Sequence, residues 1–146
     1  MNQTIDTNKE PLLLYLENEG IWITVKEYYD PTEHIKIPAE YKTDLASIPR
    51  IFWSVIPPYG LSERAPLNHD WFYGHAGLET DFFDDNGNKV FSRKVSKKEA
   101  DAIFLKLMEE EHIKKWKRIV AYYAVHWFGI WAWEKHLRRN NEKNNI

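Results

Sequence analysis

The sequence of 146 residues contains no cysteine. This absence excludes disulfide bonds, thiolate nucleophiles and metal sites built on thiolate ligands. An excess of positive charge is also missing, because the formal net charge is -2 at pH 7. Composition therefore gives no electrostatic reason to expect a nucleic acid as partner.

Long apolar segments are missing as well. Met1 to Glu10 is polar and carries no apolar core of a signal peptide. The most apolar stretch, Ile119 to Trp133, has fifteen residues and is interrupted by His126. A transmembrane helix needs about 20 apolar residues, so we expect no membrane span.

Aromatic residues, in contrast, are abundant. The chain is 43% hydrophobic and 15% aromatic, with seven Trp, eight Tyr and seven Phe. Disordered chains lack such a composition, and this length suits one domain with one sizeable core. We therefore expect a single domain over residues 1–146, with loose tails at about 1–10 and 138–146.

The first third of the chain has the pattern of β-strands. Pro11 to Asn18 and Ile21 to Tyr29 are rich in Leu, Ile, Val and Tyr, and Glu19-Gly20 separates them. Apolar residues alternate in the second run, which predicts a hairpin. His34 to Pro38 is expected to be a third short strand.

Helical patterns dominate the remainder. Ser62 to Tyr73 predicts one helix, the capping box that starts at Ser96 opens a second to about Glu111, and Ile113 to Leu137 predicts a third. Asp85-Asn86-Gly87-Asn88 is a turn signal between two apolar pairs. The predicted fold is α+β: a small N-terminal antiparallel sheet packed on C-terminal helices, with a hairpin inserted near 79–93.

The motif Thr-Asp-Leu-Ala-Ser-Ile-Pro-Arg over Thr43–Arg50 places polar residues inside an otherwise apolar run. The pair His69-Asp70 begins nineteen positions later, and Asp101 lies at the edge of the apolar stripe of its predicted helix. Buried polar groups are costly unless they are paired. We therefore expect these side chains to converge. The candidate catalytic residues are Asp44, Ser47, Arg50, His69, Asp70 and Asp101.

One interpretation of this cluster is a divalent metal site. Three carboxylates and one imidazole, from Asp44, His69, Asp70 and Asp101, suit Zn, Mn or Mg with positions left open for water. Such an ion could lower the pKa of bound water and drive hydrolysis, while Arg50 orients an anionic group of the substrate.

The other interpretation is a structural network. Asp44 would accept backbone N–H groups at a turn, Arg50 would clamp a carboxylate, and Ser47 would cap a short helix. Such networks specify a unique core in a small domain. No ligand triplet at metal-binding helical spacing is present, and Ser47 lacks the glycine-flanked turn of a nucleophile. Both interpretations stay open.

The last predicted helix is a second candidate for function. One explanation of its aromatic content is packing in the core. The alternative is an exposed patch that docks on another protein, and the flanking basic residues also suit an interfacial membrane contact. The aromatic residues are Trp116, Tyr122, Tyr123, Trp127, Phe128, Trp131 and Trp133.

Three parts of the chain together resemble the domain-of-unknown-function family 1353. They are Ile37-Pro38 through the octapeptide 43–50; Ala65 with His69-Asp70 and Tyr73; and the segment Glu99 to Phe104 with Met108. The resemblance runs from about Ile35 to Gly129. The chain departs from the family pattern at Lys97 and Lys98, where members commonly carry an Arg, and in the acidic hairpin from Glu79 to Arg93.

The resemblance implies a small phage- or prophage-associated domain located in the host cytoplasm or the phage particle, and it implies no reaction. Two functions are compatible with the residues. The first is a metal-dependent hydrolase acting on a cell-wall or phosphoester substrate. The second is a non-enzymatic virion component, assembly factor or host inhibitor that contacts another phage or host protein through its aromatic helix.

Overall fold

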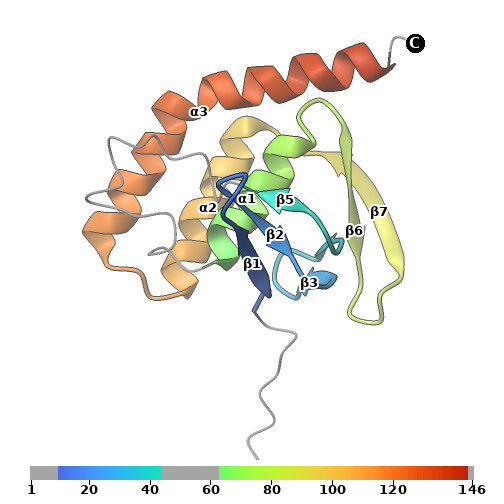
Figure 1. Cartoon of the computed structure of the whole chain (residues 1–146), viewed down its shortest axis with the longest axis horizontal. Helices are drawn as coiled ribbons and strands as arrows, with labels where there is room; N and C mark the ends of the chain where they lie inside the picture. The colour runs from blue at the N-terminus through green and yellow to red at the C-terminus, as the bar shows by residue number, and fades with distance from the viewer. Residues whose placement is uncertain (1–9, 44–62, 145–146) are drawn as a thin grey trace, which may run out of the picture.

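The computed structural model describes residues 10–43 and 63–144. Asp44, Ser47 and Arg50 of the octapeptide lie outside these ranges. Ten elements follow one another in the described parts, and the α+β class is confirmed (Figure 1). They are β1 (Leu13–Leu16), β2 (Ile21–Thr24), β3 (Tyr28–Asp30), β4 (Ile35–Ile37), β5 (Lys42–Thr43), α1 (Arg64–Gly74), β6 (Glu79–Phe83), β7 (Lys89–Lys94), α2 (Lys97–Glu110) and α3 (Lys115–Asn144).

The described strands form three small antiparallel sheets, ordered β1-β2-β5, β3-β4 and β6-β7. The predicted first hairpin is confirmed, with Leu16 opposite Ile21. The run predicted from Ile21 to Tyr29 is divided, however, and β3 belongs to a separate sheet. The Thr24 hydroxyl donates to the Pro38 carbonyl oxygen at 2.7 Å, and the backbone N–H of Glu40 donates to the Thr24 carbonyl oxygen at 2.8 Å, so the later chain lies against the end of β2.

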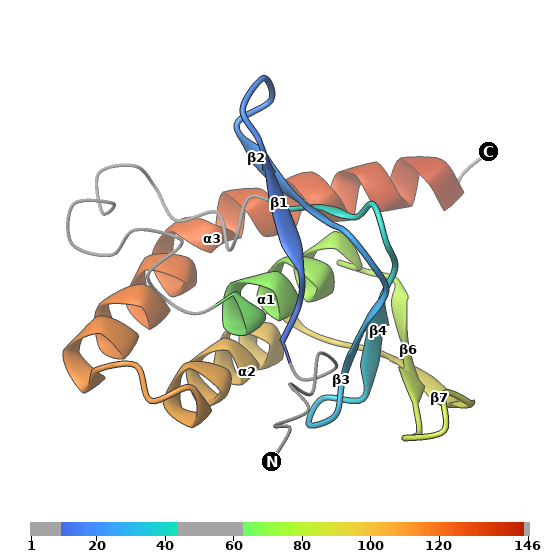
Figure 2. The ribbon, with the colours of Figure 1, turned by 60° about the horizontal axis from the view of Figure 1, so that its bottom comes forward.

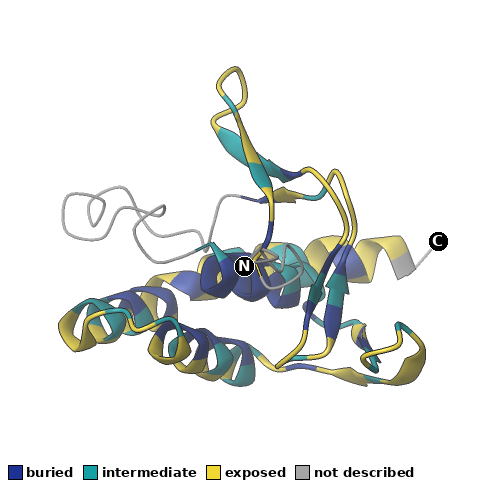
Figure 3. Ribbon diagram, turned by 90° about the horizontal axis from the view of Figure 1, so that it is seen from below, coloured by how far each residue is buried: buried dark blue, intermediate teal, exposed yellow. Residues whose placement is uncertain are grey.

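Helix α1 lies at the centre of the molecule and is buried along most of its length (Figures 2 and 3). On one side Leu67 and Phe72 pack with Tyr28, Ile35 and Ile37 of the strands. A second cluster lies between α2 and α3, with Ala65 of α1 at its edge, and contains Ala65, Phe104, Leu107, Met108, Ala121 and Val125. The strands therefore reach the later helices largely through α1.

The capping box predicted at the start of α2 is confirmed. The Ser96 hydroxyl accepts the backbone N–H of Glu99 at 3.1 Å, as expected. The Glu99 carboxylate accepts two hydrogen bonds from the Arg93 guanidinium of β7, and these together with the backbone N–H of Ser96 lower its pKa. The predicted hairpin near 79–93 is confirmed as β6 and β7, and this exposed ion pair joins it to α2.

Helix α3 is longer than predicted. The loose tail expected from residue 138 is wrong for residues 138–144, which remain helical to Asn144. The reason is Asn140, which is buried and whose side-chain amide donates to the carbonyl oxygens of Gly74 at 3.1 Å and Ala76 at 2.9 Å. A tertiary contact of this kind holds a segment whose polar composition alone suggests fraying.

A buried ion pair joins the β3–β4 turn to the start of α1. The Arg64 guanidinium donates to the two carboxylate oxygens of Asp30 at 2.7 and 3.0 Å. Asn68 and the backbone N–H groups of Thr32 and Glu33 also donate to Asp30. Burial alone would raise the pKa of Asp30, but these donors outweigh it and lower the pKa to about 2.

The Asp30 carboxylate is expected to make stability dependent on acid. Because its pKa falls from 3.8 to about 2 on folding, it contributes about 2 kcal/mol above pH 4, which is lost as the pH falls toward 2. Asp30→Asn should cost roughly 3 kcal/mol at pH 7, since it removes the buried carboxylate that accepts two hydrogen bonds from Arg64. Arg64 would keep the more exposed Glu110 and Glu111 as charged partners. Urea unfolding between pH 7 and 3 measures both effects.

The exposed Glu17 provides the control, and Glu17→Gln should leave the unfolding curve unchanged. Equal stability of Asp30→Asn and the original protein across this pH range would contradict the assigned role of the ion pair.

Candidate functional site

His69 of α1 and Asp101 of α2 meet in the interior. His69 Nε2 lies 2.8 Å from Asp101 Oδ1, and each side chain is only 1% exposed. The predicted convergence of these two residues is therefore confirmed. Helix periodicity predicts this burial for Asp101, because the residue lies beside the apolar stripe of α2.

Asp101 is bound by three side-chain donors. Besides His69, the Tyr73 hydroxyl donates to Oδ1 at 2.7 Å and the Lys97 ammonium donates to Oδ2 at 2.7 Å. Burial raises the pKa of Asp101, but these three groups outweigh it, and the net pKa is lowered. The carboxylate is thus held ionised by α1 and α2 together.

Lys97 extends the network to the third helix. Its ammonium also lies 3.3 Å from the carbonyl oxygen of Val125 and 3.1 Å from that of His126, both in α3. At this departure from the family pattern, the lysine contacts the carboxylate, whereas Arg93 pairs with Glu99. The Asp101 network, defined as His69, Tyr73, Lys97 and Asp101, therefore ties all three helices together.

Asp70 lies elsewhere. Neighbouring residues of a helix point about 100° apart. Asp70 therefore points away from His69 and lines a surface cavity, where its side chain lies 3.4 Å from the Tyr41 hydroxyl. Within the described ranges 10–43 and 63–144, no group of three or more His, Asp or Glu side chains could hold a metal ion. Of the predicted site residues, the structure thus joins His69 to Asp101 and separates Asp70.

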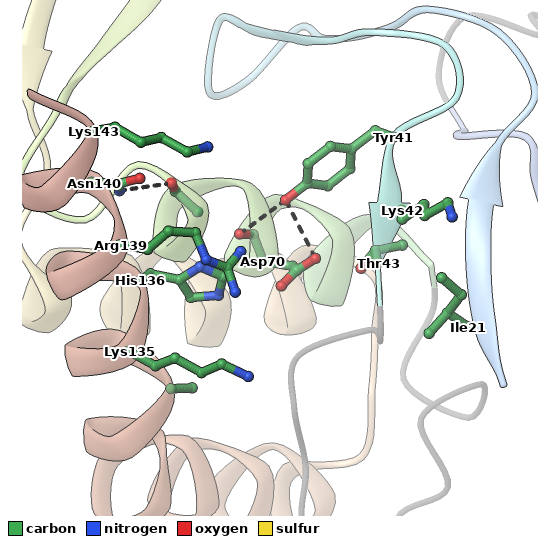
Figure 4. Close-up of a pocket in the computed structure, with 12 residues that line it drawn as sticks. Ile21, Tyr41, Lys42, Thr43, Asp70, Lys135, His136, Arg139, Asn140 and Lys143 are labelled. Carbon is green, nitrogen blue, oxygen red and sulfur yellow. Dashed lines mark hydrogen bonds between the residues drawn. The ribbon is translucent and has the colours of Figure 1, made fainter. Parts of the chain in front are cut away.

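The cavity beside Asp70 has a volume of about 600 Å³. Figure 4 shows its two sides: Tyr41, Lys42 and Thr43 line one, and the second half of α3 lines the other. Thr43 is the first residue of the octapeptide, so that motif starts at the wall of this cavity. Sequence reasoning did not select the α3 residues that line it, although basic residues recur there at steps of four.

The aromatic helix is only partly buried. Ala121, Ala124 and Val125 pack in the interior, whereas Trp127 and Trp131 are each 66% exposed. Large apolar side chains recur at steps of three or four along the outer face. We call this face the aromatic stripe: Trp116, Ile119, Tyr123, Trp127, Ile130 and Trp131.

Among the helices within residues 10–43 and 63–144, none is long and apolar enough to cross a membrane.

Gly129 sets how closely α3 approaches α1. A Cβ atom at this position would lie 2.6 Å from the Tyr73 hydroxyl oxygen, which is already bonded to Asp101. The close approach also allows the ring of Trp133 to pack edge-on against Tyr73, with centroids 5.2 Å apart. A glycine is therefore required where the two helices cross.

Gly129→Ala should destabilise the protein by roughly 1–3 kcal/mol, because the added methyl group collides with a buried hydroxyl. In an exposed helix the same change stabilises by about 1 kcal/mol. A loss of stability in Gly129→Ala would therefore indicate the collision with Tyr73. Thermal unfolding measures the change. The cost should shrink in a Tyr73→Phe background, which removes the colliding oxygen, and an equal cost in both backgrounds would contradict the contact.

Comparison with known proteins identifies the family. The model of the family described as protein of unknown function (DUF1353) matches residues 23–125, more than half of the chain. The chain belongs to this family, as its motifs predict. The match contains His69, Asp70 and Asp101 and ends before the second half of α3. No curated protein and no solved structure shows significant similarity to the chain.

Proposed function

We propose that this chain is a non-enzymatic binding domain of phage or prophage origin that docks on another protein through the aromatic stripe. The observation that carries the proposal is the exposure of Trp127 and Trp131, one helical turn apart on one face. Tryptophan is the residue most enriched among those that dominate binding energy in interfaces. A contiguous apolar face of this kind is typical of an interaction site.

The surroundings of the stripe indicate the chemistry of the partner. Lys97, Lys98, Trp127 and Ile130 are among the residues that line a shallow, mainly apolar groove beside it. The charge of Lys97 is taken up by Asp101, so Lys98 supplies the remaining cation. A partner that presents an apolar side chain flanked by a carboxylate would complement this groove.

The interior network supports a binding role over a hydrolytic one. The Asp101 carboxylate accepts hydrogen bonds from three side chains, and it lies in the interior with His69. Groups that are buried and paired in this way stabilise a core. Packing explains the Asp101 network but does not explain why the aromatic stripe of α3 is exposed.

The double variant Trp127→Ala/Trp131→Ala should fold with a stability change of about 0.5 kcal/mol or less, because both side chains lie at the surface. We expect the original protein to retain a partner protein when it is purified from host cells and the double variant to lose it, as quantified by mass spectrometry. Tyr15→Ala is the control, since Tyr15 is an exposed aromatic residue of β1, 47% exposed.

Loss of the partner in the control variant as well would contradict the proposal. So would binding of the stripe to vesicles of anionic lipid, or a dimer that the double variant abolishes, because each would replace a protein partner by a different occupant.

A metal-dependent hydrolase is the second candidate, and one observation favours it: Asp70 faces the 600 Å³ cavity where the octapeptide begins. The sequence predicts Asp44, His69, Asp70 and Asp101 as ligands of Zn, Mn or Mg. Because His69 and Asp101 pair with each other in the interior, an ion in this cavity would rely on Asp70 and Asp44. A cell-wall or phosphoester substrate would then occupy the cavity.

Metal analysis of protein purified without chelator separates the two candidates. The hydrolase predicts a stoichiometric ion that is lost in Asp44→Ala and Asp70→Asn while folding is retained. The binding domain predicts no stoichiometric ion, and it predicts that His69→Ala is destabilised by roughly 1–3 kcal/mol because Asp101 loses a buried donor. Calorimetry on the same preparations measures the second effect.

A further inference from the structure

The second half of α3 presents a row of cations to the cavity beside Asp70. Lys135, Arg139 and Lys143 are spaced four residues apart and therefore lie on one face of the helix. All three line the cavity, and Figure 4 shows their side chains extending from α3 toward the wall that carries Tyr41 and β5. We call this row the basic wall.

The basic wall has no ion-pair partner among the residues that the structure describes, since none of the ion pairs found there includes Lys135, Arg139 or Lys143. A fourth cation of the cavity, Lys42, pairs with Glu19 at 2.9 Å. Among the described residues of the lining, Asp70 contributes one carboxylate beside the three cations of the basic wall, which is an excess of about two positive charges.

The helix dipole accounts for only part of this pattern. Cations are favoured in the last turn of a helix, where the carbonyl groups lack partners. Lys143 occupies that turn, but Lys135 lies more than two turns before Asn144. The cavity, and not the helix end alone, is what the three side chains share.

The walls of the cavity are fixed by hydrogen bonds that do not involve the cations. Asn140 holds α3 on the carbonyl oxygens of Gly74 and Ala76. On the opposite wall, the Tyr41 hydroxyl lies 3.3 Å from the backbone oxygen of Asp70. The positions of the two walls are therefore set before any ligand arrives, which lowers the cost of binding.

We propose that this cavity binds a phosphorylated small molecule, with its phosphate on Arg139 at the middle of the row and with Lys135 and Lys143, one helical turn away on either side, adding electrostatic attraction. A phosphomonoester carries a charge of about -1.5 to -2 at pH 7, which matches the local excess. The planar guanidinium of Arg139 can donate two hydrogen bonds to phosphate oxygens, and the lysines add point charges. A volume of about 600 Å³ suits a ligand of small-molecule size.

A small molecule is favoured over a nucleic acid. The net charge of the whole chain is -2, whereas protein surfaces that bind nucleic acids are extended and strongly basic.

The basic wall lies beyond residue 125, where the family match ends. The family match therefore does not account for the basic wall, and the proposed site is independent of the docking role of the aromatic stripe.

The test is a titration of the ¹⁵N-labelled full-length protein with inorganic phosphate and with ribose 5-phosphate, followed by two-dimensional NMR at constant ionic strength. Both ligands should shift the amide signals of 135–143 and 70–74 saturably. Arg139→Gln should weaken binding about tenfold, since it removes a charge-assisted pair of hydrogen bonds. Lys143→Gln should weaken it less, because a lysine donates to phosphate as a point charge.

The matched control is Arg138→Gln, because Arg138 is the exposed neighbour on the same helix and does not line the cavity. It removes the same charge and should leave the affinity within twofold. Trp127→Ala/Trp131→Ala should also bind phosphate normally, so failure of the docking proposal and failure of this one are distinguishable.

Three results would overturn the proposal. They are an equal loss in Arg138→Gln and Arg139→Gln, which means nonspecific attraction; no saturable shift with either phosphate; and tighter binding of a single-stranded oligonucleotide than of ribose 5-phosphate, which means an open polyanion surface.

Discussion

The buried carboxylate of Asp101 is the constraint on which the arrangement of the helices depends. It lies on α2, accepts hydrogen bonds from His69 and Tyr73 of α1, and holds the Lys97 ammonium against two carbonyl oxygens of α3. An ionised group in the interior is stable only when such donors surround it. Because the donors lie on α1 and α2, and Lys97 also reaches α3, satisfying the carboxylate links the three helices.

The position of α3 then determines both surfaces to which we assign a function. In its first half, the side that carries Ala121 and Val125 packs in the interior and the aromatic stripe faces outward. In its second half, the basic wall faces the cavity beside Asp70. One helix thus supplies a face suited to a protein partner and another suited to an anion.

Sequence alone predicts the parts of this structure that depend on local or periodic signals. The cap at Ser96, the hairpin over 79–93 and the burial of Asp101 are of this kind. Arg64 and Asp30 were not selected, because they lie 34 positions apart and neither belongs to a motif. The full length of α3 does not follow from the sequence, since only the folded chain brings the carbonyl oxygens of Gly74 and Ala76, at and just after the end of α1, to Asn140. The separation of His69 from Asp70, in contrast, follows from helix geometry.

Amide hydrogen exchange of Lys97→Met, compared with Lys98→Met, tests the central claim most directly. Lys97 joins Asp101 to α3, whereas Lys98 is its exposed neighbour. The account predicts at least about tenfold faster exchange over residues 121–135 in Lys97→Met, with β6 and β7 unchanged and Lys98→Met like the original protein. Identical protection of α3 in both variants would contradict it.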